Sequence, residues 1–118
     1  MSERTKRALV IEDEAIVAML IEDLLEDIGC EVAASAATAR EALELARICD
    51  VDFALLDVNL GEGQTSVEAA NVLRDRQVPY IWLTGYGLQG VPPDHADAPL
   101  LHKPIHPGLF AAVVRSFA

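Results

Sequence analysis

Two residue types that often stabilise small folds are scarce in this sequence. The chain of 118 residues contains two cysteines, Cys30 and Cys49, and aromatic residues make up 5% of it. Isolated cysteines in apolar surroundings are typical of reduced, packed thiols in a cytoplasmic protein, with one disulfide as the alternative. A core of Ala, Val, Leu and Ile favours a helix-covered sheet over an aromatic-rich β-sandwich.

Positive charge is also scarce. The chain has 9 Lys and Arg residues against 19 Asp and Glu residues, which gives a net charge of −10. This imbalance argues against binding to nucleic acid or to an anionic membrane. No apolar run approaches the roughly 18 residues of a membrane-spanning helix, and the N-terminal residues lack the apolar stretch of a signal peptide. We expect one cytoplasmic domain over residues 1–118, without an output domain.

The short apolar runs that are present end in acidic residues. Residues 53–56 are Phe-Ala-Leu-Leu and lead into Asp57, with Gly61 close behind. A continuous apolar run closed by turn residues predicts a strand that is buried on both faces. Residues 8–11 form a similar run, which ends in the acidic stretch 12–14. Both runs therefore predict central strands with carboxylates at their ends.

Strand-like and helical patterns alternate along the whole chain. We expect strands at 8–11, 31–35, 53–57, 79–84 and 100–103, and helices at 16–28, 38–46, 65–76 and 107–117. This alternation predicts an α/β fold with a parallel sheet and right-handed crossovers. The Gly- and Pro-rich segment 85–99 interrupts the pattern, so we expect an irregular connection there with at most one helical turn.

The predicted helices have recognisable ends and apolar sides. Gly29 is the expected C-terminal stop of the first helix. Capping boxes and a proline at the first helical position mark three helix starts: Thr38 with Glu41, Thr65 with Glu68, and Pro107. In the first helix we expect an apolar side of Ile16, Leu20, Leu24 and Ile28, with Val17, Ile21 and Leu25 beside them. In the last helix the expected apolar face is Leu109, Phe110, Val113, Val114 and Phe117.

Reactive side chains stand at the ends of four predicted strands. They are, in chain order, Glu12-Asp13, Asp57, Thr84 and Lys103-Pro104. The carboxyl ends of parallel strands lie on one edge of a sheet, so these residues can share one site. Mutually repelling carboxylates favour a hard cation such as Mg²⁺. A carboxylate oxygen could then attack phosphorus to form an acyl phosphate, with the lysine and the threonine hydroxyl binding the new group.

These residues, in this order and at these spacings, resemble the receiver domain of two-component response regulators, and the resemblance covers the whole chain. It implies a flavodoxin-like (βα)5 fold with strand order 2-1-3-4-5. It further implies that Asp57 accepts a phosphoryl group from the phosphohistidine of a histidine kinase. The chain would then be a regulator rather than an enzyme, catalysing only its own phosphorylation and dephosphorylation.

The resemblance also implies individual roles at the site. Asp13 and Asp57 would bind Mg²⁺ directly, Glu12 mainly through water, and Asn59 through its backbone carbonyl. Thr84 would move toward the phosphoryl group, and Lys103 would pair with it. The bond between Lys103 and Pro104 would be cis.

Three features depart from the common receiver pattern. Leu100 stands where many receivers carry an aromatic switch residue, so the usual coupling between threonine and aromatic side chain cannot operate unchanged. Leu60-Gly61 replaces a common Met-Pro pair, and the fourth helix is largely absent.

The segment 78–87 resembles that of a subgroup of single-domain receivers with a Phe-Ala-Thr-Gly-Tyr signature, in which Trp82 and Leu83 here replace Phe-Ala. That subgroup is typically alphaproteobacterial and tends to serve histidine kinases of the HWE class. Tyr86 would tune access of hydrolytic water, or it would simply pack on the sheet edge.

Other interpretations remain open at this point. An aspartyl-phosphate phosphatase of the haloacid dehalogenase type requires a second aspartate at the position where this sequence has Asn59. A flavodoxin-like cofactor carrier requires a phosphate-binding loop after the first strand, and no such loop follows it here. A binding module that never uses phosphate is the remaining rival. Output would pass through contacts with an unknown protein or through a phosphate-sink role.

The histidines and the tryptophan are expected to be structural. His95, His102 and His106 have no second metal ligand at a known spacing, so His106 is expected at a helix start and His95 in a loop. Trp82 is expected in the core, with an output surface as the alternative.

Overall fold

The computed structural model describes residues 5–85 and 90–116. Its strands are β1 (Arg7–Ile11), β2 (Glu31–Ala36), β3 (Phe53–Asp57), β4 (Tyr80–Thr84) and β5 (Leu100–His102). Its helices are α1 (Ala15–Asp27), α2 (Ala39–Ile48), α3 (Val67–Asp75) and α4 (Pro107–Arg115), with a single 3₁₀ turn, η1 (Pro93–His95). The five strands are all parallel and lie in the order β2-β1-β3-β4-β5, which confirms the predicted fold.

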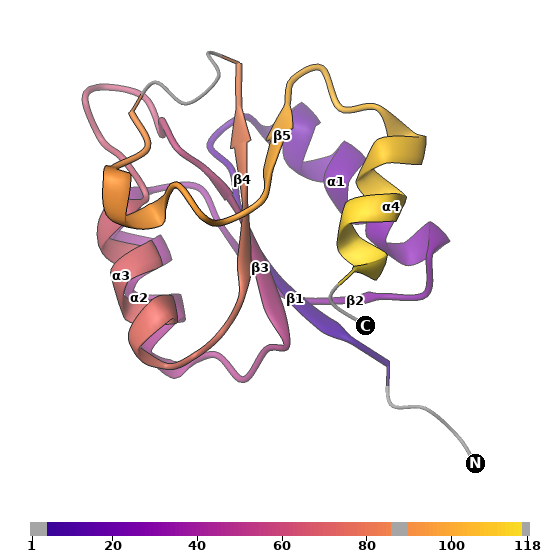
Figure 1. Ribbon diagram of the computed structural model, residues 1–118, viewed down its shortest axis with the longest axis horizontal. Helices are drawn as coiled ribbons and strands as arrows, with labels where there is room; N and C mark the ends of the chain where they lie inside the picture. The colour runs from indigo at the N-terminus through magenta and orange to yellow at the C-terminus, as the bar shows by residue number, and fades with distance from the viewer. Residues whose placement is uncertain (1–4, 86–89, 117–118) are drawn as a thin grey trace.

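The sheet is covered by helices on both faces. Figure 1 shows α2 and α3 on one side of the strands and α1 and α4 on the other. Every residue of β3 and β4 is buried, as the continuous apolar runs predicted. Along β3 the side chains alternate: Ala54 and Leu56 pack toward α2 and α3, whereas Phe53 and Leu55 pack toward α1 and α4. This two-sided burial leaves the strand ends as the place where polar groups can gather.

Three of the predicted helix ends are confirmed, those at Gly29, Thr38 and Pro107, the last of which is the first residue of α4. Gly29 has a φ of +83° and follows the cap of α1, where its N–H donates to the Glu26 carbonyl and the next N–H donates to the Leu25 carbonyl. The Thr38 hydroxyl accepts the N–H of Glu41 at 3.1 Å and donates to its carboxylate at 3.3 Å, which is the expected capping box.

The predicted capping box of Thr65 and Glu68 is wrong. α3 begins one residue later than that pair requires, with Ser66 at the cap position and no side-chain cap bond. The Ser66 hydroxyl is used elsewhere, as a donor to the Asp57 carbonyl. The helix therefore starts where the returning loop is tied to β3, which local sequence alone does not reveal.

The predicted apolar side of α1 is confirmed at Ile21 and Leu25 but wrong at Ile16 and Leu20. Ile16 is 83% exposed and Leu20 is 42% exposed, whereas Ile21 and Leu25 are fully buried. Each step of four residues rotates by about 40° around a helix of 3.6 residues per turn, so a row at spacing four winds away from the buried face. In α4 the same effect leaves Leu109 53% exposed while Phe110 and Val114 are buried, and the predicted Phe117 lies outside the described residues.

The connection from β4 to β5 is irregular in the part that the structure describes, as predicted, with η1 as its one helical turn between residues 90 and 99. Trp82 is fully buried, which confirms its place in the core. His95 lies in η1 and is also buried, at 2% exposed, so this loop residue belongs to the packed interior. Cys30 and Cys49 are both free. Within the described ranges, no helix combines the length and apolar character that crossing a bilayer requires.

Candidate functional site

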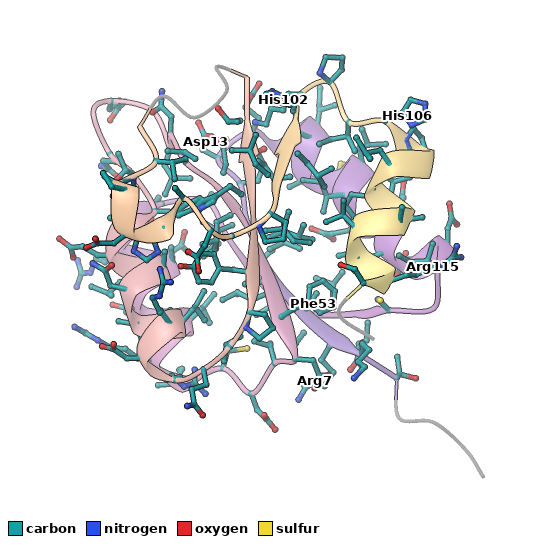
Figure 2. The ribbon with its side chains drawn as sticks, in the orientation of Figure 1. Arg7, Asp13, Phe53, His102, His106 and Arg115 are labelled. Carbon is teal, nitrogen blue, oxygen red and sulfur yellow. The ribbon has the colours of Figure 1, made fainter. Side chains whose placement is uncertain are left out.

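The predicted site lies at the carboxyl edge of the sheet. Figure 2 shows Asp13, which follows β1, and His102, which ends β5, at the same end of the molecule. Arg7, at the start of β1, lies at the opposite end (Figure 2). Thr84 ends β4 beside His102 in the strand register and is 3% exposed. The parallel topology thus gathers the residues at the strand ends on one edge.

Four carboxylates form the centre of this edge. One oxygen from each of Glu12, Asp13, Glu14 and Asp57 lies within 4.8 Å of the others. Glu12 is 2% exposed and Asp57 is 5% exposed, so two of these groups are buried at the strand ends. Like charges this close repel strongly where water is excluded. A cation beside the two buried groups, Glu12 and Asp57, would favour their ionisation together.

Lys103 supplies one cation to this cluster. Its Nζ lies 2.9 Å from Asp57 Oδ2, 2.7 Å from Glu12 Oε1 and 3.5 Å from Glu14 Oε1. The Lys103 backbone N–H donates to the Thr84 carbonyl at 2.8 Å, which ties the end of β5 to the end of β4. The Lys103–Pro104 peptide bond is cis, as the resemblance implied. The lysine is thus placed by the sheet rather than by a flexible loop.

Charge and burial shift the pKa values of Lys103 and Glu12. Burial alone lowers the pKa of Lys103, but the carboxylates of Glu12 and Asp57 outweigh burial and raise it above its usual range. Burial raises the pKa of Glu12 well above the ordinary carboxyl range, hydrogen bonding to Asp57 adds to the rise, and Lys103 opposes it. Beside Asp57, the Glu12 carboxyl group therefore keeps a proton more readily than an exposed carboxyl group does.

The donor set fits a divalent cation. Glu12 Oε1 is buried and has no aligned hydrogen-bond donor among the described residues, although the Lys103 ammonium lies 2.7 Å away. A buried carboxylate oxygen with an unused acceptor direction, next to the carboxylates of Asp13 and Asp57, is suited to Mg²⁺, which prefers oxygen ligands. Glu12 Oε2 is engaged differently, because it accepts the backbone N–H of Glu14 at 3.2 Å.

The loop after β3 brings its backbone close to this cluster. The Asn59 side chain accepts the Gly61 N–H at 2.9 Å, which closes a tight turn. Gly61 has a φ of +84°, and a Cβ built on it would lie 3.3 Å from Asp13 Oδ2. Proline, whose φ is held near −65°, cannot adopt this conformation, so the departure from the Met-Pro pair reflects a different turn. The glycine allows the chain to pass directly beside Asp13.

Of the side chains expected to tune the site, the structure describes Leu100 but not Tyr86. Leu100 begins β5, is partly buried and pairs with Trp82 in the strand register, so an aliphatic side chain occupies the position of the aromatic switch. Tyr86 lies outside the described residues. Glu14, noted in the sequence only as an extension of the acidic run, contributes an oxygen to the cluster.

Ser66 is the residue at this site that sequence reasoning missed. Its hydroxyl donates to the Asp57 carbonyl at 2.7 Å, and it is 1% exposed. The available signal was the Thr65-Ser66 pair before α3, where either residue could have been the cap.

Comparison with known proteins points to one family. A family model described as the response regulator receiver domain matches residues 8–113. The phyllosphere-induced regulator PhyR of Methylorubrum extorquens is 35% identical over 111 residues, which are 90% of this chain and 41% of PhyR. The chain thus spans about two fifths of the length of that curated relative.

Two further relatives are matched over most of their own length. The polar-differentiation response regulator DivK of Brucella ovis is 32% identical over 90 residues, which are 73% of this chain and 72% of DivK. The solution structure of SdrG from Sphingomonas melonis Fr1 superimposes with a TM-score of 0.84 at 31% identity and covers 96% of both chains. The likeness therefore extends over the sheet and its helices as a unit.

Proposed function

Because this chain belongs to the response regulator receiver domain family, we propose that Asp57 accepts a phosphoryl group from the phosphohistidine of a histidine kinase. Receiver domains interact with histidine kinases and with downstream effectors, and they generally bind Mg²⁺ at an acidic pocket. The observation that carries the proposal is the contact of 2.9 Å between Lys103 Nζ and Asp57 Oδ2 at the rim of the carboxylate cluster.

In the proposed reaction a carboxylate oxygen of Asp57 attacks phosphorus. The P–N bond of the phosphohistidine breaks, its electron pair returns to the imidazole, and an acyl phosphate forms on Asp57. The Lys103 ammonium, which already lies beside Asp57, pairs with the new phosphoryl oxygens. The Thr84 hydroxyl, at the end of the neighbouring strand, donates to the same group.

The proposed metal ligands are Glu12, Asp13, Asp57 and the backbone carbonyl of Asn59. When bound, Mg²⁺ would neutralise the carboxylates and the phosphoryl oxygens as they come together. The buried Glu12 Oε1 supports this role, because it already lies 2.7 Å from one cation, the Lys103 ammonium, and has no aligned hydrogen-bond donor among the described residues.

Output is proposed to follow from the loss of the Lys103 contacts. A phosphoryl group on Asp57 would draw Lys103 away from Glu12 and Glu14, to which it is now paired. Because Lys103 directly follows β5, the surface formed by β4, β5 and α4 would change with it. This surface would contact a downstream protein, or the domain would serve as a phosphate sink.

We infer a kinase of the HWE class as the donor. The inference rests on the Thr84-Gly85-Tyr86 sequence after β4, which matches the end of the signature found in receivers that such kinases serve. Transfer from a phosphorylated HWE-class kinase should be at least tenfold faster than transfer from a kinase of another class, and equal rates would contradict the inference.

The Asp57→Asn variant tests the proposed function. Labelling by acetyl phosphate with Mg²⁺, followed by intact-protein mass spectrometry, should give one added phosphoryl group on the wild type and none on this variant. Asp75→Asn, at the exposed end of α3, is the matched control and should label normally. Stoichiometric labelling of Asp57→Asn would refute the assignment of the acceptor.

A second measurement distinguishes the proposed phosphoryl acceptor from a binding module that works without phosphorylation. Beryllofluoride, a mimic of the phosphoryl group, should bind the wild type in a Mg²⁺-dependent manner and shift the backbone NMR signals of residues 57–60 and 100–103. A wild type that neither labels nor responds to beryllofluoride would favour the binding module.

A further inference from the structure

Ser66 is tied to the segment that carries the proposed phosphoryl acceptor. Its hydroxyl donates to the carbonyl of Asp57 at 2.7 Å, and its backbone N–H donates to the carbonyl of Val58 at 3.1 Å. One residue thus holds two successive carbonyl groups at the end of β3. Ser66 is 1% exposed, so water does not compete for these bonds.

The backbone bond from Ser66 belongs to a short antiparallel bridge. Asn59 pairs with Thr65, the Ser66 N–H donates to Val58, and the Leu60 N–H donates to the Gln64 carbonyl at 2.9 Å. In this arrangement the paired residue Asn59 does not use its own N–H and carbonyl in the bridge. The bridge therefore holds Asn59 through its neighbours and leaves its carbonyl for another partner.

The side-chain oxygen of Asn59 is already used within the loop and does not replace the backbone carbonyl as a free acceptor. Asn59 Oδ1 accepts the N–H of Gly61 and closes the turn, so the backbone oxygen is an acceptor of this exposed residue that neither the turn nor the bridge uses. A carbonyl in this position is suited to a hard cation held beside Asp57.

The Ser66 side chain does not cap α3, although it stands at the cap position. It stands at the cap position of α3, where a serine side chain normally accepts an N–H from the first helical turn. No such bond forms here, and the hydroxyl is turned toward β3 as a donor. Ser66 therefore bonds the α3 start to the acceptor strand, while the neighbouring Thr65 hydroxyl accepts the N–H of Val67 at 3.4 Å.

We propose that Ser66 is a positioning residue for the site, whose hydroxyl and N–H hold the Asp57–Asn59 backbone so that the Asp57 carboxylate and the Asn59 carbonyl bind one cation together. This inference rests on the proposed function, because it concerns the same Mg²⁺ site. Ser66 touches neither the metal nor the phosphoryl group in it, and acts only through the backbone that it holds.

The test compares Ser66→Ala with Thr38→Ala by calorimetric titration of the full chain with Mg²⁺. Loss of an outer-shell hydrogen bond typically weakens metal binding 10- to 100-fold, so we expect about tenfold weaker binding for Ser66→Ala. Thr38→Ala removes a hydroxyl that caps α2 with a 3.1 Å bond, outside the carboxylate cluster, and its Mg²⁺ affinity should equal that of the wild type.

Two further measurements separate positioning from packing. Ser66→Cys nearly preserves the volume of the side chain but replaces the hydroxyl by a weak donor, so its Mg²⁺ affinity should fall almost as far as that of Ser66→Ala. In the metal-free protein, the Leu60 amide, bonded to Gln64, should exchange its hydrogen faster in both Ser66 variants than in Thr38→Ala.

The outcomes are distinguishable. A wild type that binds no Mg²⁺ would overturn the proposed function and this inference together. A wild type that binds Mg²⁺ with an affinity shared by Ser66→Ala and Ser66→Cys would overturn this inference alone. Equal weakening in Ser66→Ala and Thr38→Ala would show a general loss of stability and would also overturn it.

Discussion

Nε2 of the buried His95 lies 2.6 Å from Oδ1 of Asn71, and this contact joins the β4–β5 connection to α3. Because the Asn71 oxygen accepts, the neutral ring carries its proton on Nε2, and Nδ1 accepts the hydroxyl of Tyr80 in β4. The Trp82 indole donates to the His95 carbonyl at 3.2 Å. A single histidine therefore bonds η1 to both a helix and a strand.

An ion pair strengthens the same attachment from outside. Arg74 of α3 pairs with Asp97 at 2.9 Å and donates to the carbonyl of Asp94, on either side of His95. Residues 90–99 contain one 3₁₀ turn and no α-helix that could pack on the sheet. These polar contacts therefore hold the connection against α3 and β4.

The first prediction concerns the pH dependence of stability through His95. Burial lowers its pKa below the ordinary value of 6.5, and Arg74 on α3 adds to the fall, while Asp94 and Asp97 oppose it and Tyr80 faces it as a neutral donor. The unfolded chain thus binds the proton more readily than the folded protein. The stabilisation is complete above pH 6.5 and is lost as the pH falls from 6.5 through the lowered folded pKa.

Urea unfolding of the wild type should therefore show a loss of up to about 1 kcal/mol between pH 6.5 and 5.5, attributable to this group. His95→Gln, which cannot take up the proton, should be less stable than the wild type at pH 7.5 but should lack this part of the pH dependence. Parallel pH profiles of the two proteins would contradict the role given to His95.

The second prediction concerns Lys103 as the resident cation. Lys103→Met leaves Glu12 and Asp57 close together and buried without their ammonium partner. Removing one member of a fully buried ion pair costs about 3–5 kcal/mol. Because the Lys103 side chain is 18% exposed, we expect a smaller loss of about 2 kcal/mol in the metal-free protein. MgCl₂ should then raise the free energy of unfolding more in the variant than in the wild type.

Urea unfolding with and without Mg²⁺ measures both effects, with Lys103→Arg as the control that keeps the charge. If Mg²⁺ stabilises Lys103→Met no more than it stabilises the wild type, lysine and metal do not compensate the same carboxylates.

The third prediction uses two glycines as a matched pair. Gly61 has a φ of +84° and Gly63 a φ of +76°, so alanine at either position is strained by about 1 kcal/mol. Only at Gly61 would the new Cβ meet a side chain, with Asp13 Oδ2 at 3.3 Å, whereas nothing lies within 4 Å at Gly63. Both variants should lose similar stability.

Mg²⁺ titration distinguishes the two glycines. Gly61→Ala should bind the ion several-fold more weakly, because Asp13 must shift, and Gly63→Ala should bind it as the wild type does. Equal affinities in the two variants would show that Asp13 tolerates the added methyl group without losing its place in the cluster.

The order of elements and the convergence of Asp57 and Lys103 could be predicted from the sequence. A continuous apolar run identifies a buried strand wherever it occurs, and parallel strands bring their carboxyl ends to one edge whatever the distance along the chain. The caps at Thr38 and Gly29 were equally accessible, because their partners lie within a few residues.

Other features depended on which elements came to lie against each other. The burial of α1 on Ile21 and Leu25 rather than on Ile16 follows from where the helix crosses the sheet. Ser66 reaches nine residues back to Asp57, and His95 reaches 24 residues back to Asn71. The sequence by itself determined the strands, their helices and the reactive groups at their ends, because hydrophobic periodicity and capping act locally. Only the tertiary structure decided the hydrogen bonds that hold those groups in place, since a polar side chain pairs with whatever the packing of the core brings within 3 Å of it.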